Sequence, residues 1–215
     1  MKPRTRHTAG FTLTELVLAG AILAVSLGAL TLFTSRSADA LGTGALQAEL
    51  DARLRRTLAR VTDELLPSGA AVLSPPATAP AGSSTLTYRR SEGAVNGAIH
   101  WGAPQRLAFA YETGELDDDL DNNRNGLVDE GVVTWTRDVG SADEVSVILC
   151  HDVAEYAAGE VENDVDDDGD GLVDERGFSF ERTSSHVRVH LTLARLDAQR
   201  RPLTRTLEVT LQPRN

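Results

Sequence analysis

Oxygen-bearing side chains alternate in two acidic stretches of this chain, one at residues 117–130 and one at residues 160–175. Within them DLDNNRNGLVDE, at residues 119–130, aligns without gaps with DVDDDGDGLVDE, at residues 164–175. Alternating carboxylate and amide oxygens around a glycine turn suit calcium, which takes six to eight oxygen ligands at ~2.3–2.6 Å. The repeat therefore predicts two calcium-binding loops, each holding one ion.

The glycine of each repeat, Gly126 or Gly171, fixes which residues face the ion. In the first loop the expected ligands are Asp121, Asn123, Asn125 and the Leu127 carbonyl, with Asp129 or Glu130 closing the shell. In the second loop they are Asp166, Asp168, Asp170 and the Leu172 carbonyl, with Asp174 or Glu175 closing the shell. Without a cation the carboxylates of the second loop would repel one another. We therefore expect calcium to have a structural role and to order these insertions.

The loops differ from an EF-hand, because that motif needs a glutamate at loop position 12 and Val132 and Gly177 stand there. They resemble the shorter Asp-rich calcium loops of thrombospondin-type and dockerin-like repeats. The alternative interpretation is a pair of solvated acidic turns, which are common where an Asp-Gly run ends a strand.

Other chemistry has little support in the sequence. Neither a phosphate-binding loop nor a convincing set of serine, histidine and acid is visible, so we expect a protein that is not an enzyme; a metal-dependent hydrolase is a weak alternative. Cys150 is the only cysteine and is expected to be a buried free thiol, with His151 on the opposite face of a strand. The net charge of −11 argues against general nucleic-acid binding, and leaves open a small local basic patch.

The N-terminal region has the composition of a membrane segment. Residues 1–10 form a short basic leader, and residues 11–33 are apolar with Glu15 as the only ionisable side chain. These 23 residues, at about 1.5 Å each in a helix, are long enough to cross a ~30 Å hydrocarbon core. The positive charge before the span predicts that the leader stays in the cytoplasm and that the rest of the chain is exported.

Residues 34–66 continue the helix as an amphipathic segment, followed by a linker loop at 67–84. Leucine and valine recur at helical spacing, at Leu46, Leu50, Leu54, Leu58, Val61 and Leu65. The linker contains SPPATAPAGSS, at residues 74–84, whose Pro and Gly content is typical of a loop.

Residues 85–215 are expected to form a β-rich domain that carries the acidic loops. Strands are predicted at 85–89, 106–111, 132–137, 145–149 and 178–182, and an antiparallel hairpin is predicted from the alternating apolar residues at 187–193 and 207–211. The apolar stripe of the helix is the expected cover for the sheet. The fold class is therefore α+β, a long N-terminal helix packed on an antiparallel sheet with acidic loop insertions.

The leader ends at Gly10, and Phe11 to Leu16 then open the apolar helix with a glutamate at position 15. This junction resembles the prepilin signature of type IV pilins and type II secretion pseudopilins. The resemblance implies that a prepilin peptidase cuts between Gly10 and Phe11 and methylates Phe11. It also implies that Glu15 pairs with the N-terminal amine of a neighbouring subunit. A carboxylate inside a membrane costs a few kcal/mol and needs a partner; the alternative is a signal anchor whose Glu15 lies near the interface.

Many major pilins have two C-terminal cysteines, and a proline is common within the pilin span. This sequence has neither feature, which favours a minor pilin or pseudopilin. The resemblance implies a single-pass inner-membrane protein with a periplasmic domain, later part of a type IV pilus or a type II secretion pseudopilus. Its implied partners are other pilins or pseudopilins, the prepilin peptidase and an inner-membrane assembly platform. The alternative function is a membrane-anchored, calcium-dependent adhesin or binding module at a filament tip or cell surface.

Overall fold

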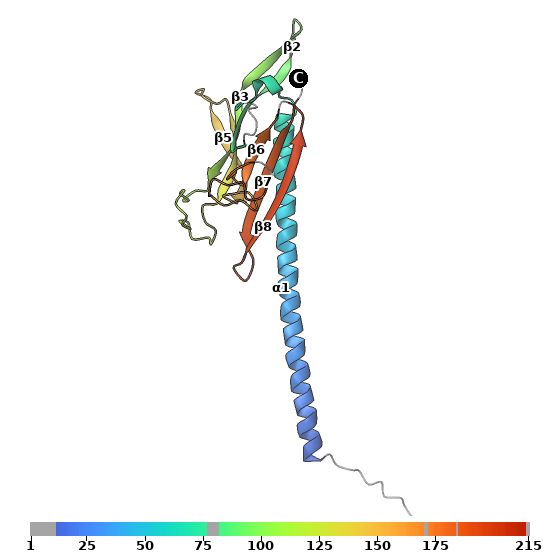
Figure 1. Cartoon of the computed structure of the whole chain (residues 1–215). Coiled ribbons are helices and arrows are strands. Elements are labelled where there is room, and N and C mark those ends of the chain that lie inside the picture. The colour runs from blue at the N-terminus through green and yellow to red at the C-terminus, as the bar shows by residue number, and fades with distance from the viewer. Residues whose placement is uncertain (1–11, 77–81, 170–171, 184, 214–215) are drawn as a thin grey trace, which may run out of the picture. The chain divides into compact units, whose positions relative to one another are not determined.

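The computed structural model describes residues 12–76, 82–169, 172–183 and 185–213 (Figure 1). The chain divides into two compact units, Met1–Gly44 and Ala45–Asn215. Helix α1, Leu13–Leu65, contributes to both units. The second unit also contains the short 3-10 helix η1 (Ala70–Val72) and the strands β1 (Gly82–Ser83), β2 (Thr85–Val95), β3 (Ala98–Tyr111), β4 (Gly131–Arg137), β5 (Val145–Val153), β6 (Phe178–Arg182), β7 (Val187–Leu196) and β8 (Pro202–Leu211).

Helix α1 is continuous through Gly42 and Gly44, and the boundary between the two units falls directly after Gly44. Each glycine costs about 1 kcal/mol relative to alanine within a helix. The helix ends at Leu65, where Ser68 donates its backbone amide and its hydroxyl to the Leu65 carbonyl. Pro67 lacks a backbone N–H and follows within two residues, so the chain turns away at this point.

Within the described residues, eight strands form one antiparallel sheet in the order β1-β6-β7-β5-β4-β3-β2, and β8 pairs with the other edge of β7. The hairpin of β7 and β8 pairs Val187 with Leu211 and Leu196 with Pro202. The predicted C-terminal hairpin is therefore confirmed. Figure 1 shows the strands of the second unit beside the C-terminal part of α1. This is the α+β arrangement of helix and antiparallel sheet that the sequence predicts.

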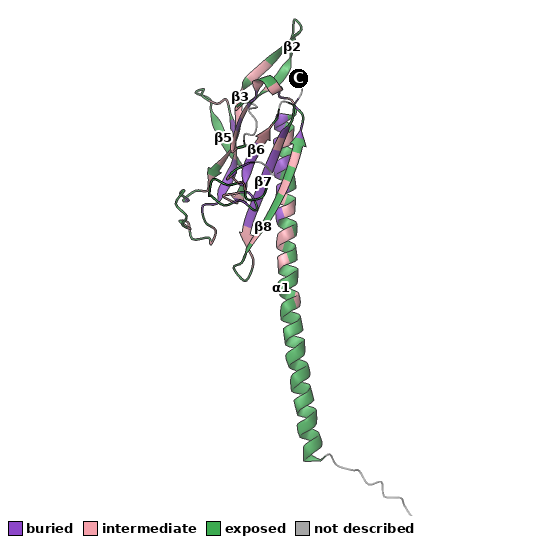
Figure 2. Ribbon diagram, in the orientation of Figure 1, coloured by how far each residue is buried: buried purple, intermediate pink, exposed green. Residues whose placement is uncertain are grey.

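The core lies between the sheet and the C-terminal half of α1. Five side chains of the predicted helical stripe are buried at no more than 4% exposure: Leu50, Leu54, Leu58, Val61 and Leu65. They join one hydrophobic cluster with strand residues that include Tyr88, Leu107, Phe178, Val189 and Leu191. Figure 2 shows this difference along α1, where buried positions are confined to the part that lies in the second unit. Apolar burial therefore fixes the helix on the sheet.

Several strand boundaries differ from the sequence prediction. Strands β2 and β3 extend into a hairpin whose turn is Asn96-Gly97, with φ of 54° and 80°. An Asn-Gly pair suits this turn, because both central residues need positive φ. Strand β1 lies inside the predicted linker, and β8 begins at Pro202, upstream of the predicted segment 207–211. Proline is tolerated at the first residue of an edge strand.

Candidate functional sites

Both acidic loops leave the sheet at the same end. The first connects Tyr111 of β3 to Gly131 of β4, and the second follows Val153 of β5 and leads into β6. Gly131 pairs with Tyr111 on one side and with Val153 on the other. The antiparallel register of three neighbouring strands thus places the bases of the two loops next to each other (Figure 1).

The two loops share one backbone scaffold, in which each residue of the first matches the residue 45 positions later. Asp129 Oδ2 accepts the amides of Asp118 and Asp119, at 3.2 and 2.7 Å. Its counterpart Asp174 accepts the amides of the two matching residues, at 3.0 and 2.8 Å. Backbone angles also agree, since φ is positive at Asp119, Asp129, Asp164 and Asp174. The sequence repeat is therefore a structural repeat, and these two aspartates hold the loop backbone.

Two buried glutamates that were not among the predicted ligands accept backbone amides of the loops. Glu115 accepts the amides of Asn122 and Asn123, at 3.4 and 2.7 Å, and is 5% exposed. Glu160 accepts the amides of Asp167, Asp168 and Asp174, at 3.0, 2.9 and 3.1 Å, and is 7% exposed. The signal was present, because the repeat extends upstream to Gly114-Glu115 and Gly159-Glu160.

In the first loop, predicted ligands converge on Glu130. Its Oε1 accepts the side-chain amides of Asn123 and Asn125, at 2.7 and 2.5 Å, and its Oε2 is buried with no hydrogen-bond partner among the described residues. Because the O and N of an asparagine amide can exchange by a flip, the same positions can present oxygens to a cation. Asp121 accepts the amides of Asn125 and Gly126, at 3.1 and 2.8 Å. Of the two closing residues left open by the sequence, Glu130 faces these asparagines and Asp129 holds the backbone.

In the second loop, one carboxylate oxygen from each of Glu160, Asp166 and Asp168 lies within 4.8 Å of the other two. Such a group could hold a metal ion. Glu175 is buried, and its carbonyl accepts the amide of Ala157 at 2.9 Å, as the carbonyl of Glu130 accepts that of Glu112 at 3.0 Å. The predicted ligand Asp170 lies outside the described residues.

The two carbonyl ligands, on Leu127 and Leu172, stay predictions, but the structure places both residues. The Leu127 amide donates to Asn125 Oδ1 at 2.8 Å. The Leu172 side chain is 4% exposed and packs against Gly82, where an added Cβ would lie 3.3 Å from Leu172 Cδ1. Leu172 thereby anchors the second loop to strand β1.

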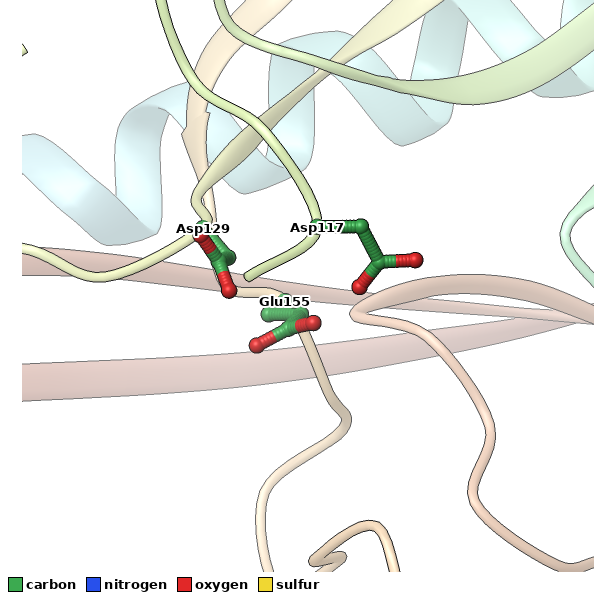
Figure 3. Close-up of side chains that lie close together, drawn as sticks. All are labelled: Asp117, Asp129 and Glu155. Carbon is green, nitrogen blue, oxygen red and sulfur yellow. The ribbon is translucent and has the colours of Figure 1, made fainter. Parts of the chain in front are cut away.

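A second acidic group lies at the base of the first loop and consists of Asp117, Asp129 and Glu155 (Figure 3). Arg176 donates to Glu155 Oε1 at 2.5 Å and to Asp117 Oδ2 at 3.5 Å. Its guanidinium lies 5.6 Å from the ring centre of Tyr111 and 4.6 Å from that of Tyr156. Burial raises the pKa of Glu155 even though Arg176 acts to lower it, and the charges of Asp129 and Asp117 raise it further. Arg176 thus links the first loop to the segment that leaves the second.

Cys150 and His151 are oriented as the sequence suggests. Cys150 is buried, which raises the pKa of its thiol, and His151 is exposed with Nδ1 at 2.6 Å from Glu112 Oε2. Alternation along strand β5 therefore separates the two side chains.

The N-terminal unit supplies the other candidate site. By length and composition α1 could cross a membrane: an 18-residue window has mean hydropathy 2.4 and none of it is buried. Glu15 Oε2 accepts the backbone amide and the hydroxyl of Thr12, both at 2.9 Å, and the Glu15 amide donates to Thr12 Oγ1 at 3.3 Å. This is a capping box, which satisfies donors at the start of a helix. The predicted processing residues Gly10 and Phe11 lie outside the described residues.

Comparison with protein-family models, with curated proteins and with solved structures finds no match for this chain. The α+β arrangement, the apolar helix and the two acidic groups therefore carry the functional argument by themselves.

Proposed function

We propose that this chain is a pilin-like subunit, a minor pilin or pseudopilin, that inserts in the inner membrane and assembles through its N-terminal helix into a type IV pilus or a type II secretion pseudopilus. The observation that carries the proposal is the apolar surface of α1 in the first unit. Its large side chains are more than half exposed, among them Leu13 at 78%, Val25 at 73% and Phe33 at 70%. So large an apolar surface needs cover from lipid or from other helices.

The same helix also packs into a folded domain. The C-terminal part of α1 is buried in the core with the sheet, and the same helix carries the exposed apolar side chains toward its N-terminus. A leader that ends at Gly10 and a single carboxylate at Glu15 add the residues that a prepilin peptidase and a neighbouring subunit would recognise. The other partner is an inner-membrane assembly platform. The domain would lie in the periplasm before it enters the filament.

The proposal includes one structural calcium ion in each acidic loop. In the second loop, support comes from the three carboxylates within 4.8 Å of one another. In the first loop, it comes from the buried Oε2 of Glu130, which has no hydrogen-bond partner among the described residues and lies beside two asparagine amides. A buried carboxylate oxygen without a donor costs free energy, and a cation would remove that cost. The ion would tie each loop together and stiffen the end of the sheet.

The test of the assembly proposal is the mature N-terminus. Mass spectrometry of the chain from native envelopes should find a methylated Phe11, and co-purification should recover other pilin-like subunits. Gly10→Val should leave the full-length precursor in the membrane and outside filaments. Recovery of only the full-length chain, in cells with an active prepilin peptidase, would contradict the proposal.

A matched pair of variants separates the two roles of Glu15. Thr12→Ala and Glu15→Ala both break the capping box and so weaken the start of the helix. If Glu15 also sets subunit register, Glu15→Ala should enter filaments poorly, whereas Thr12→Ala should enter them nearly as well as the wild type. The measurement is the fraction of each variant in sheared filaments relative to the membrane. Equal incorporation of the two variants would reduce Glu15 to a helix cap.

An alternative function, a membrane-anchored calcium-dependent adhesin, is favoured by one observation. The acidic loops expose aliphatic side chains at matching positions: Leu116, Leu120 and Val128 in the first loop, and Val161, Val165 and Val173 in the second, each between 47% and 62% exposed. Exposed apolar side chains on ordered loops are suited to contact with a partner. An anchored adhesin requires neither cleavage after Gly10 nor filament incorporation, so the N-terminus experiment distinguishes the two functions.

A further inference from the structure

The acidic group at the base of the first loop is built differently from the two predicted loop sites. Asp117 comes from the start of the first loop, Asp129 from its end, and Glu155 from the segment that follows β5. One oxygen from each carboxylate lies within 4.8 Å of the other two. Figure 3 shows the three carboxylates pointing toward one another. We propose that Asp117, Asp129 and Glu155 form a third site for a hard divalent cation such as calcium, separate from the two loop sites.

The observation that points to a ligand is the state of Asp129. This residue is 1% exposed, its Oδ2 accepts two backbone amides, and its Oδ1 is buried with no hydrogen-bond partner among the described residues. The matching residue Asp174 is half-buried, and each of its two oxygens accepts an amide. The same scaffold therefore gives both carboxylate oxygens of Asp174 a hydrogen bond, whereas Oδ1 of Asp129 has none among the described residues. Burial of a carboxylate oxygen without a donor is unfavourable unless a cation compensates it.

The local charge also fits a divalent cation. The three carboxylates carry three negative charges, and Arg176 contributes one positive charge through its contacts with Glu155 and Asp117. Arg176 packs against the rings of Tyr111 and Tyr156 and makes no hydrogen bond to Asp129 Oδ1. The remaining charge of the four side chains is −2. Calcium accepts carboxylates from separate segments and completes its shell with water, since its coordination geometry is flexible.

The test counts calcium ions on the full-length chain in detergent micelles, after removal of metal with a chelator. Native mass spectrometry and calorimetry should show three ions on the wild type and two on Asp117→Asn. The matched control is Glu162→Gln, which changes the carboxylate 45 positions later and should retain three ions. Both positions are exposed, so neither substitution threatens the core.

A further variant distinguishes a metal site from an internal ion pair. Arg176→Gln should tighten binding of the third ion several-fold, because a neighbouring positive charge is removed. If instead Arg176 is the only cation that this group holds, Arg176→Gln should bind only the two calcium ions of the loop sites, and its Tm should be lower than that of the wild type.

An ion count that is unchanged by Asp117→Asn would overturn the third site, whatever the total. The loop sites are tested separately: Asp121→Ala and Asp166→Ala should each remove one ion. Loss of an ion in the Asp117 variant alone would support the third site and contradict the loop sites.

Discussion

The two acidic loops have one backbone scaffold and different charge. Residues 115–130 contain seven acidic residues and Arg124, whereas residues 160–175 contain nine acidic residues and no basic residue. Where the first loop has Asn123 and Asn125, the second has Asp168 and Asp170. The asparagine side chains of the first loop donate to Glu130, and the aspartates of the second cannot donate when ionised.

Because of this difference in charge, we expect the loops to depend on calcium to different extents. The first loop satisfies part of its buried charge with its own amides, so it can keep its shape at low calcium. The second loop places carboxylates within 4.8 Å of one another, and their repulsion opposes a compact turn. We therefore expect the second loop to bind calcium more tightly and to open first when calcium is removed.

The largest expected effect follows removal of calcium from a soluble fragment that begins near Arg36. The hydrophobic core lies within Ala45–Asn215, so this fragment retains it. Each loop site adds about 2.7 kcal/mol when free calcium is 100-fold above its Kd. At about 2–4 °C of Tm per kcal/mol, two sites should raise the Tm by roughly 10–20 °C. Calorimetry measures this shift, and magnesium should give a smaller one, because its octahedral shell fits an irregular carboxylate loop poorly.

Hydrogen exchange then tests the order of opening in the same fragment. Amides at residues 160–175 should lose protection before those at 115–130 as calcium is withdrawn. Simultaneous loss in both loops would contradict the proposed difference. If the fragment bound no calcium at millimolar concentrations, the alternative interpretation of both loops as solvated acidic turns would hold.

The sequence predicted the parts of this molecule that follow a regular period. The helical stripe from Leu50 to Leu65 and the alternation in β7 and β8 specify buried faces. The structure buries the stripe and the apolar face of β7, whereas in β8 only Leu211 is buried and Leu207 and Val209 are half-buried. The β2–β3 hairpin was missed because its outer half is exposed on both faces, so no alternation marks it. The Asn96-Gly97 pair, which is typical of a hairpin turn, was the feature of the sequence that could have predicted it.

The candidate metal groups were predictable only in part. Spacing identified Asp166 and Asp168, because neighbouring ligands in one loop are fixed by the glycine turn. It did not identify Glu155 or Arg176, since the register of β4 with β5 brings Glu155 to the first loop and a bridge to Tyr156 brings Arg176 there. Nor could spacing decide between Asp129 and Glu130, because adjacent residues point in different directions and only the folded loop shows which one faces the asparagines.

A smaller effect, and a sharper test of the comparison, comes from exchanging the residues that differ. Asp168→Asn with Asp170→Asn gives the second loop the residues of the first, and Asn123→Asp with Asn125→Asp does the reverse. Two carboxylates about 4 Å apart repel by about 1 kcal/mol in water, so the first pair should raise the stability of the calcium-free fragment by about 1–2 kcal/mol. The same pair should weaken calcium binding at the second loop, because a calcium site is tuned by the number of charged ligands. The reverse pair should lower calcium-free stability and tighten binding at the first loop.

Urea unfolding in chelator and calorimetry with calcium measure the two quantities. If both pairs changed stability in the same direction, charge would not be the source of the difference between the loops, and the asparagine contacts with Glu130 would have to explain it alone.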